Sequence, residues 1–260
     1  MSKLRHASKY LSYAAKAKTE HSVHSPYMYA FVTEVIYGAT DRTVTKGIEG
    51  MRKKWLLSPD DVAVTDYGAG SQVIQSNVRP VAKMAKYAVK SRKYSELLYR
   101  IAQRLNPEHV LELGTSLGIT AAYLAQGAPE ASIHTVEGCP NIAQLAQQTI
   151  DTVGAKNIHI YTGTFENEVP TLLDKYKPEL IFFDGNHRYR PTLDYFEWAL
   201  PYAQEDSLFI FDDIHWSSEM SKAWKIIKKH PDVSFTIDLF ALGLVFFKSN
   251  TAKQHLTIRY

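Results

Sequence analysis

The feature that most constrains this chain is a regular alternation of short apolar runs with helix-period patterns, which begins near residue 105. Each apolar run has the length of a β-strand and is rich in β-branched, leucine or aromatic residues. The predicted strands cover residues 109–113, 133–136, 158–161, 180–183 and 208–211. The predicted helices cover residues 120–126, 142–153, 169–176, 192–203 and 218–229. This alternation predicts a parallel sheet with helices on both faces.

The pattern changes after the last of these helices. Residues 233–239 and 242–248 are predicted strands that are separated only by Phe240 and Ala241, a gap too short for a crossover helix. The two strands must therefore pair as an antiparallel hairpin. The predicted fold is a Rossmann-like α/β sheet of seven strands, with five parallel strands and a C-terminal antiparallel hairpin. An ordinary dinucleotide-binding sheet has no such ending.

The first part of the chain has a different character. Residues 4–18, 26–37 and 81–105 have helical patterns, whereas residues 38–60 show no clear period. We therefore predict a mostly helical N-terminal extension over residues 1–84, acting as a lid, and a sheet domain over residues 85–260.

Charge divides unevenly along the chain. Residues 1–104 carry 18 Lys and Arg against 8 Asp and Glu, and residues 105–260 carry 12 against 19. A basic half favours an anionic partner, and a solvated basic face beside an acidic domain is the alternative. The lone Cys139 cannot form an internal disulfide, and no signal-peptide pattern is present, so we expect a cytoplasmic location. No apolar run reaches the ~20 residues of a spanning helix, so we expect no transmembrane segment.

The strongest local motif follows the first predicted strand, where Val-Leu-Glu112-Leu-Gly114 leads into Thr115-Ser116-Leu-Gly118 and a helix. Glycines here remove side chains that would keep a ligand from the backbone, and the helix start offers free N–H groups. The spacing differs from the G-x-G-x-x-G dinucleotide fingerprint. The motif predicts a cofactor-binding loop, with a simple tight turn as the alternative.

Two further strand ends extend this predicted site. Glu137 and Gly138 end the next strand, about 25 residues after the glycine loop, where an acid can accept both hydroxyls of a ribose. Thr164 and Phe165 follow the third strand, where we expect the adenine ring. An exposed loop glutamate is the alternative for Glu137. The combined pattern favours a ribose-bearing cofactor.

Acidic motifs end the fourth and fifth strands. Asp184-Gly-Asn-His187 follows one strand, and Asp212-Asp213-Ile-His follows the next. Because the carboxyl ends of parallel strands meet at one edge, these carboxylates should converge there. Oxygen ligands of this kind suit Mg²⁺ or another hard divalent cation. His187 is a candidate proton acceptor.

These acids also have less specific explanations. Asp212 and Asp213 can serve as a helix N-cap and a solvated charge. Arg188 and Arg190 follow the first motif, and if they turned inward they would neutralise the acids without a metal.

Two remaining motifs stay without an assigned role. The cluster Asp66-Tyr-Gly-Ala-Gly70 resembles a nucleotide loop, but the residues before it make a poor buried strand and no acid-ended strand follows at the right distance. The segment from His21 through His24 to Pro26 and Tyr29 is rich in polar and aromatic groups. It either contacts the substrate or only caps and packs.

The motifs VLELGTSLGITAAYLA, HTVEG, IFFDGNHRY and FIFDDIHW, with the terminal hairpin, resemble the class I S-adenosylmethionine-dependent methyltransferases. The chain is most similar in pattern to small-molecule O-methyltransferases of the catechol and caffeoyl-coenzyme A type, over roughly residues 85–250. The resemblance implies that the glycine loop holds the methionine part of the cofactor and that Glu137 holds the ribose. It also implies that residues 89–94 approach the cofactor.

The same resemblance implies divalent-metal ligands at Asp184, Asp212 and Asp213. Asp213 departs from the asparagine that is usual in the family, and His187 stands where the catechol enzymes have a catalytic lysine. We therefore expect methyl transfer to a hydroxyl of a small-molecule acceptor. If the basic residues 1–104 face the acceptor, we expect the acceptor to be anionic. The alternatives are a metal-independent N- or O-methyltransferase and a non-catalytic cofactor-binding module. We expect no nucleic-acid substrate, because the basic residues are scattered, and we allow for a homodimer.

Overall fold

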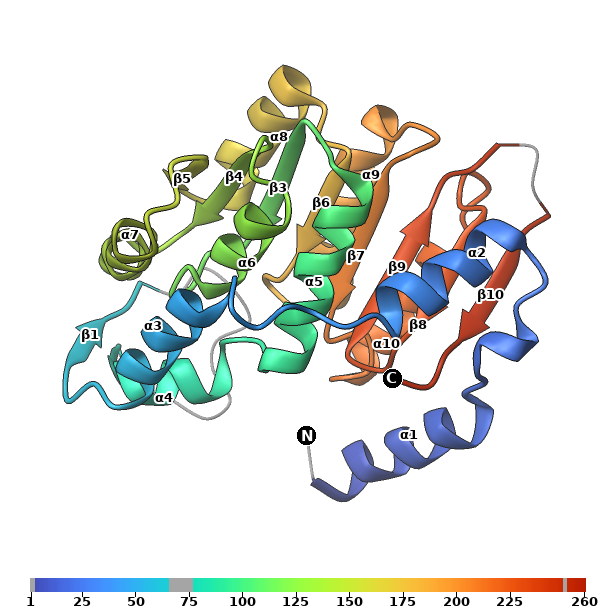
Figure 1. Ribbon diagram of the computed structural model, residues 1–260, viewed down its shortest axis with the longest axis horizontal. Coiled ribbons are helices and arrows are strands. Elements are labelled where there is room, and N and C mark those ends of the chain that lie inside the picture. Colours follow the sequence, from blue (N-terminus) through green and yellow to red (C-terminus); the bar gives the residue numbers. More distant parts are fainter. Residues whose placement is uncertain (1–2, 66–76, 250–251) are drawn as a thin grey trace. The chain divides into compact units, whose positions relative to one another are not determined.

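The computed structural model describes residues 3–65, 77–249 and 252–260, shown as ribbons in Figure 1. The chain forms two compact units. Unit 1 combines Met1–Gly38 with Glu179–Tyr260, and unit 2 is Ala39–Pro178. The cluster Asp66 to Gly70 lies outside the described residues. No helix among the described residues is long and apolar enough to cross a membrane.

Unit 2 is built on three parallel strands in the order β3-β4-β5. They are β3 (His109–Leu113), β4 (Ser132–Glu137) and β5 (Ile158–Thr162). The helices of this unit are α3 (Lys46–Leu56), α4 (Val81–Tyr87), α5 (Arg92–Leu105), α6 (Ile119–Gly127), α7 (Pro140–Val153) and α8 (Phe165–Tyr176). A short antiparallel pair, β1 (Asp61–Ala63) and β2 (Val78–Pro80), completes it.

The core of unit 2 includes a helix that the sequence patterns did not predict. Helix α3 buries Ile48, Met51 and Trp55 at helical spacing, against a cluster that contains Tyr123 of α6. The Trp55 indole N–H donates to the Thr149 hydroxyl of α7 at 2.8 Å. Gly47 and Gly50 lower the intrinsic helix propensity of this segment, so burial of its apolar face must supply the stability.

Unit 1 contains five paired strands in the order β10-β8-β9-β7-β6. They are β6 (Leu180–Phe183), β7 (Leu208–Asp212), β8 (Phe235–Asp238), β9 (Leu242–Phe246) and β10 (Gln254–Thr257). β6 and β7 are parallel, and β9 is antiparallel to both β7 and β8. β10 adds a parallel edge strand beside β8, and it was not predicted. Its polar, half-buried sequence lacks a clear strand signature.

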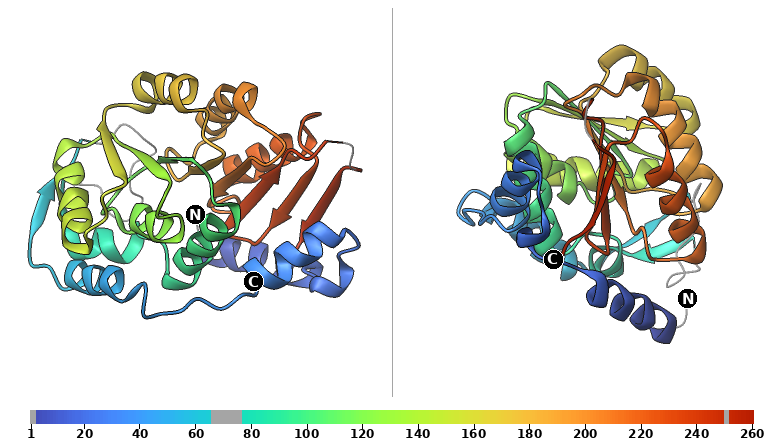
Figure 2. Two further views of the ribbon diagram at one scale, coloured as in Figure 1. Left: turned by 45° about the horizontal axis from the view of Figure 1, so that its top comes forward. Right: turned by 90° about the vertical axis from the view of Figure 1, so that its right-hand side faces the viewer.

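The helical segments of unit 1 cover both faces of these strands. They are α1 (Lys3–Lys16), η1 (Glu20–Ser22), α2 (Pro26–Ala30), η2 (Phe31–Ile36), α9 (Tyr189–Ala199), η3 (Leu200–Tyr202) and α10 (Ser218–Lys229). Figures 1 and 2 show α2 on one face of β8 and β9 and α10 on the other. Phe31 packs edge-on against Phe246 of β9, with ring centroids 5.2 Å apart.

The predicted fold class is confirmed: strands and helices alternate, the strands β3 to β7 pair in parallel within their units, and β8 and β9 form the antiparallel hairpin. The predicted helix over residues 81–105 is two helices, because the chain leaves helical geometry between Tyr87 and Arg92. The predicted division at residue 84 remains a prediction about which part folds independently.

Candidate functional site

The loop after β3 bends sharply through left-handed backbone conformations. Gly114, Ser116 and Gly118 have φ angles of 103°, 49° and 73° before α6 begins at Ile119. The Gly114 and Thr115 N–H groups both donate to the Val136 carbonyl of β4, at 3.0 and 3.2 Å. The turn leads directly into the N-terminus of α6, where the first N–H groups of a helix have no partner within the helix.

Glu137 joins this loop to the end of β4. The Ser116 N–H donates to Glu137 Oε2 at 2.9 Å, and the Cys139 N–H donates to Glu137 Oε1 at 3.0 Å. The structure therefore brings the predicted ribose acceptor to the glycine loop, and Gly138 is the residue between Glu137 and Cys139 in the turn that follows β4. The carboxylate also holds the loop itself, a role that the sequence did not indicate.

Buried polar groups lie directly beneath the loop. The Thr135 hydroxyl donates to Glu112 Oε2 at 2.6 Å, and Thr115 Oγ1 lies 2.7 Å from Thr135 Oγ1. Glu112 is fully buried, so its carboxylate belongs to this internal chain of hydrogen bonds. The Ser116 Oγ is also buried and has no hydrogen-bond partner among the described residues. A buried hydroxyl left in this state is the kind of atom that a bound ligand satisfies.

The loop after β5 lies at the same edge of unit 2. The Gly163 N–H donates to the Glu137 carbonyl at 3.1 Å, and Thr164 then precedes α8, which begins at Phe165. Glu112, Gly114, Glu137 and Phe165 thus belong to three adjoining strand ends. The predicted cofactor residues of unit 2 are brought together.

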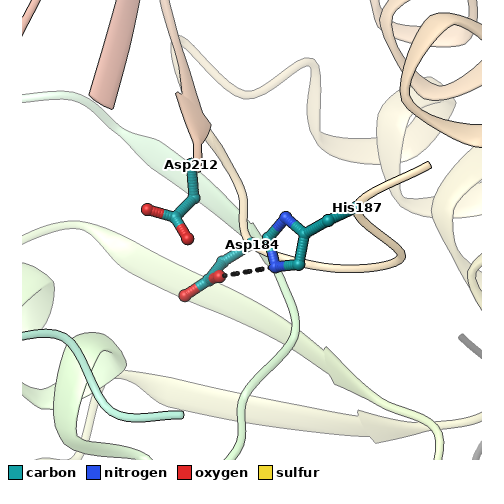
Figure 3. A group of neighbouring side chains, drawn as sticks. All are labelled: Asp184, His187 and Asp212. Atoms are coloured by element: carbon teal, nitrogen blue, oxygen red, sulfur yellow. Dashed lines mark ion pairs between the residues drawn. The ribbon is translucent and has the colours of Figure 1, made fainter. Parts of the chain in front are cut away.

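In unit 1 an acidic group gathers beyond β6 and β7. The ligand-type atoms of Asp184, His187 and Asp212 lie within 4.8 Å of one another (Figure 3). Asp212 is fully buried, while the side chains of Asp184 and His187 are 13% and 25% exposed. Two carboxylates and an imidazole at this spacing form a potential metal-binding group.

His187 acts as the positive partner of these acids in the structure. Its Nε2 lies 3.5 Å from Asp184 Oδ1. Burial alone lowers the pKa of His187, but the contact with Asp184 and the charges of Asp212 and Asp213 outweigh burial and raise that pKa to about 9. Arg190 points elsewhere, because its Nε lies 2.9 Å from Asp194. Arg190 therefore does not neutralise the acidic group in this structure.

Two neighbouring residues have unusual backbone conformations. Asp213 follows β7 with φ 52°, and Asn186 has φ 48° within the first acidic motif. The Asn186 amide donates to the Tyr195 hydroxyl at 3.1 Å, whereas its buried Oδ1 has no hydrogen-bond partner among the described residues. Left-handed backbone in non-glycine residues is strained and clusters at functional sites. The sequence reasoning had overlooked Asn186, although it stands inside the Asp184–His187 motif.

The segment around the N-terminal histidines lacks a comparable arrangement. His21 Nε2 lies 3.3 Å from Glu20 on an exposed surface, and the Ser25 hydroxyl accepts the Met28 N–H as a cap of α2. Within the described ranges, the metal-type group contains neither His21 nor His24. The capping part of the earlier interpretation fits these contacts.

Comparison with known proteins identifies the family. Residues 111–214 match the model of a methyltransferase domain. A catechol O-methyltransferase of Niastella koreensis is 29% identical over 123 residues, which are 46% of this chain and 55% of that protein. A catechol O-methyltransferase of Mycobacterium tuberculosis is 27% identical over 135 residues, covering 51% of this chain and 60% of that protein.

Solved structures give the same result for the fold. An O-methyltransferase of Bacillus cereus in complex with SAH (S-adenosylhomocysteine) has a TM-score of 0.56 at 17% identity, covering 84% of this chain and 96% of that one. A SAH-bound methyltransferase of Podospora anserina has a TM-score of 0.60 at 14% identity, covering 87% and 97%. Residues 111–214 therefore form a methyltransferase domain, and the chain shares the fold of the S-adenosylmethionine-dependent methyltransferases.

The resemblance seen in the sequence is therefore confirmed at the level of the family. The chain spans 55% and 60% of the length of the two catechol O-methyltransferases. The methyltransferase segment, residues 111–214, contains both the glycine loop and the acidic motifs. Lys9, which contacts the loop after Asp213 from α1, lies outside this segment and carried no sequence signal.

Proposed function

We propose that this methyltransferase transfers the methyl group of S-adenosylmethionine to a hydroxyl of a small-molecule acceptor with the help of a divalent cation. The observation that carries the proposal is the convergence of Asp184, His187 and Asp212 beyond two parallel strands. The names of the two relatives, both catechol O-methyltransferases, favour a hydroxyl as the acceptor. The basic charge of residues 1–104 favours an anionic acceptor.

The residues of unit 2 fit the methyl donor. Glu137 would accept the ribose hydroxyls, and the glycine loop would hold the methionine part. The buried Ser116 hydroxyl is available for a ligand contact at this loop. Thr164 and Phe165 would border the adenine ring. By holding the donor in one orientation, these residues would supply proximity, which is the main protein contribution to such a transfer.

The donor set in unit 1 fits a hard divalent cation. Asp184 and Asp212 would hold it, and the buried Oδ1 of Asn186 is a neutral oxygen in the first acidic motif. Asp213, the third ligand predicted from the sequence, is not one of the residues whose ligand-type atoms gather there. Such a cation would lower the pKa of the acceptor hydroxyl and fix its orientation.

His187 would accept the hydroxyl proton. With its pKa raised to about 9, the imidazole is already protonated near neutral pH and cannot act as a base. It becomes a proton acceptor once the carboxylate charges that raise its pKa are offset. The same acids therefore control both the cation site and the protonation of His187.

The proposal is tested by methyl transfer from labelled S-adenosylmethionine to a panel of catechols and other hydroxyl compounds. EDTA should abolish transfer and Mg²⁺ or Mn²⁺ should restore it. Asp212→Asn should weaken the response to metal, whereas Asp232→Asn, which alters an exposed acid of unit 1, should leave it intact. Full activity after exhaustive chelation would favour a metal-independent N- or O-methyltransferase. Cofactor binding without transfer to any acceptor would favour a non-catalytic module.

A further inference from the structure

The loop that carries Asp213 is fixed from outside by one lysine of the N-terminal helix. Lys9 Nζ donates to the His215 carbonyl at 2.9 Å, to the Ser217 carbonyl at 2.8 Å and to the Ser221 hydroxyl at 2.9 Å. A lysine ammonium has three N–H donors, so these contacts use all of them. Two of the acceptors lie in the segment between β7 and α10.

The Lys9 ammonium group lies at the N-terminus of α10, where a positive charge destabilises a helix. Ser217 is the N-cap of α10, and its side chain accepts the Met220 N–H at 3.0 Å. The N-terminus of a helix is the positive end of its dipole, so it repels an ammonium group. Stabilisation of α10 therefore does not explain a lysine at this place. The contacts with the loop carbonyls do.

The loop needs such restraint because it begins in a strained conformation. Asp213 has φ 52°, and the Trp216 N–H closes the turn by donating to the Asp213 carbonyl at 2.8 Å. Strained backbone persists only where surrounding contacts over-determine it. The carbonyls held by Lys9 lie two and four residues beyond Asp213.

The side chain of His215 is held from the opposite direction. Its Nε2 lies 2.8 Å from Oδ2 of the buried Asp238. The same oxygen accepts the Trp224 indole N–H at 3.4 Å, and Asp238 Oδ1 accepts the Phe240 N–H at 2.9 Å. The His215 ring stacks on Phe240 with centroids 5.4 Å apart. His215 is thus fixed at both its ring and its carbonyl.

Helix α1 reaches this cluster at a second point. Tyr10 packs edge-on against Phe240, with centroids 5.1 Å apart, and Tyr13 lies 5.3 Å from the same ring. The Tyr13 hydroxyl donates to the Ile258 carbonyl next to β10. Figure 1 shows α1 at the end of unit 1 where β8 and β10 finish. The helix therefore docks on the sheet through Tyr13 and on the loop through Lys9.

We propose that Lys9 is a positioning residue for the cation and acceptor site, which acts by holding residues 213–217, the segment that directly follows Asp212 of the acidic group. The inference rests on the proposed function, because it assigns these acids to the cation. With this role for Lys9, helix α1 contributes a positioning residue to the proposed cation site of unit 1. Methyl-donor binding should be independent of it, since the donor residues belong to unit 2.

The decisive test is Mn²⁺ binding by the intact chain with Lys9→Met, a change that keeps the length of the side chain. Loss of a nearby positive charge would by itself strengthen cation binding. Loss of positioning should instead weaken Mn²⁺ binding by about tenfold or more, as for other residues that orient metal ligands. Loss of charge and loss of positioning therefore predict opposite changes in the Mn²⁺ affinity of Lys9→Met. Lys16→Met on the exposed side of the same helix is the control and should leave Mn²⁺ affinity unchanged.

Two further measurements separate the possible failures. SAH affinity should be the same in both variants and in the unaltered chain. Equal SAH affinity would show that unit 2 is intact in the variants. Hydrogen exchange of the Trp216 amide should be faster in Lys9→Met alone. Mn²⁺ affinity that is unchanged or tighter in Lys9→Met would overturn the positioning role while leaving the proposed function standing. If the unaltered chain binds SAH but no Mn²⁺, the metal part of the proposed function fails. In that case, unchanged exchange of the Trp216 amide in Lys9→Met would also overturn the proposal that Lys9 holds residues 213–217.

Discussion

Glu137 is the residue on which we expect the proposed methyl-donor site to depend most. Its two carboxylate oxygens already accept the N–H groups of Ser116 and Cys139, so the side chain both shapes the loop and remains in reach of a ligand at that loop. Hydrogen bonds to a charged acceptor are stronger than neutral ones, and two ribose contacts should together contribute about 2–4 kcal/mol.

Glu137→Ala should therefore weaken SAH binding by that amount in calorimetry, and Glu137→Gln by less, because an amide keeps one acceptor oxygen. Glu130→Ala removes an exposed acid of the same unit and serves as the control. Equal SAH affinity in Glu137→Ala and the unaltered chain would remove Glu137 from the site.

Among the structural elements, the turn from β3 into α6 depends on Gly118 for two separate reasons. Its φ of 73° disfavours any side chain, and an added Cβ would lie 3.1 Å from the Ala146 carbonyl oxygen of α7. Gly154, at the end of α7, has the same φ of 73° but open space around its Cβ position. The pair therefore separates backbone strain from crowding between α6 and α7.

Gly154→Ala should cost about 1–2 kcal/mol of unfolding free energy from left-handed strain alone. Gly118→Ala should cost more, by about 1–3 kcal/mol of overpacking, and should also weaken SAH binding. Chemical denaturation and calorimetry measure the two effects. Equal destabilisation by both variants, with SAH affinity intact, would show that α7 does not press on the glycine loop.

The parallel strands of unit 2 carry a histidine whose protonation opposes folding. His134 of β4 is buried, its Nδ1 lies 3.1 Å from the Tyr161 hydroxyl, and its ring stacks on Tyr176 with centroids 3.8 Å apart. Burial, with smaller effects of His109, His159 and Lys175, lowers the pKa of His134 from 6.5 to about 4.

Because the folded-state pKa is below the unfolded one, the unfolded chain binds this proton first as pH falls. The contribution of His134 to stability is therefore fully present above pH 6.5 and is lost as pH falls from 6.5 toward 4. His134→Gln should flatten the pH dependence of the unfolding free energy in this window. An NMR titration that places the pKa of His134 near 6.5 would contradict this explanation.

The sequence predicts elements well where apolar runs are buried on both sides, as in β3 and β6. Prediction from the sequence fails where tertiary packing determines whether a helix or strand forms. Helix α3 contains two glycines, and its stability comes from burial of Trp55 and its neighbours. Strand β10 is polar and gains its place by pairing with β8. In the candidate site, residue type and strand position were enough to predict that Asp184 and Asp212 lie close together and that Glu137 lies at the glycine loop. The paired state of His187 and the contact of Lys9 depend on side-chain geometry between segments far apart in sequence, which no local pattern encodes.

At the scale of the whole molecule, the chain distributes the proposed chemistry over its two compact units. The residues proposed to hold the methyl donor belong to residues 39–178, and the acidic group belongs to the unit that joins residues 1–38 with 179–260. Residues 1–38 thus fold with the acidic group, and α1 contacts the loop beside it. We therefore expect changes in the N-terminal helix to alter cation and acceptor binding before they alter donor binding.

The central claim is that the acids beyond β6 and β7 bind a divalent cation for methyl transfer. Electron paramagnetic resonance of Mn²⁺ with the intact chain, saturated with SAH, tests it most directly. We expect bound Mn²⁺ in the unaltered chain and in Asp232→Asn, and loss of bound Mn²⁺ in Asp184→Asn and Asp212→Asn. Free Mn²⁺ in the unaltered chain, or equal binding by Asp184→Asn, would contradict it.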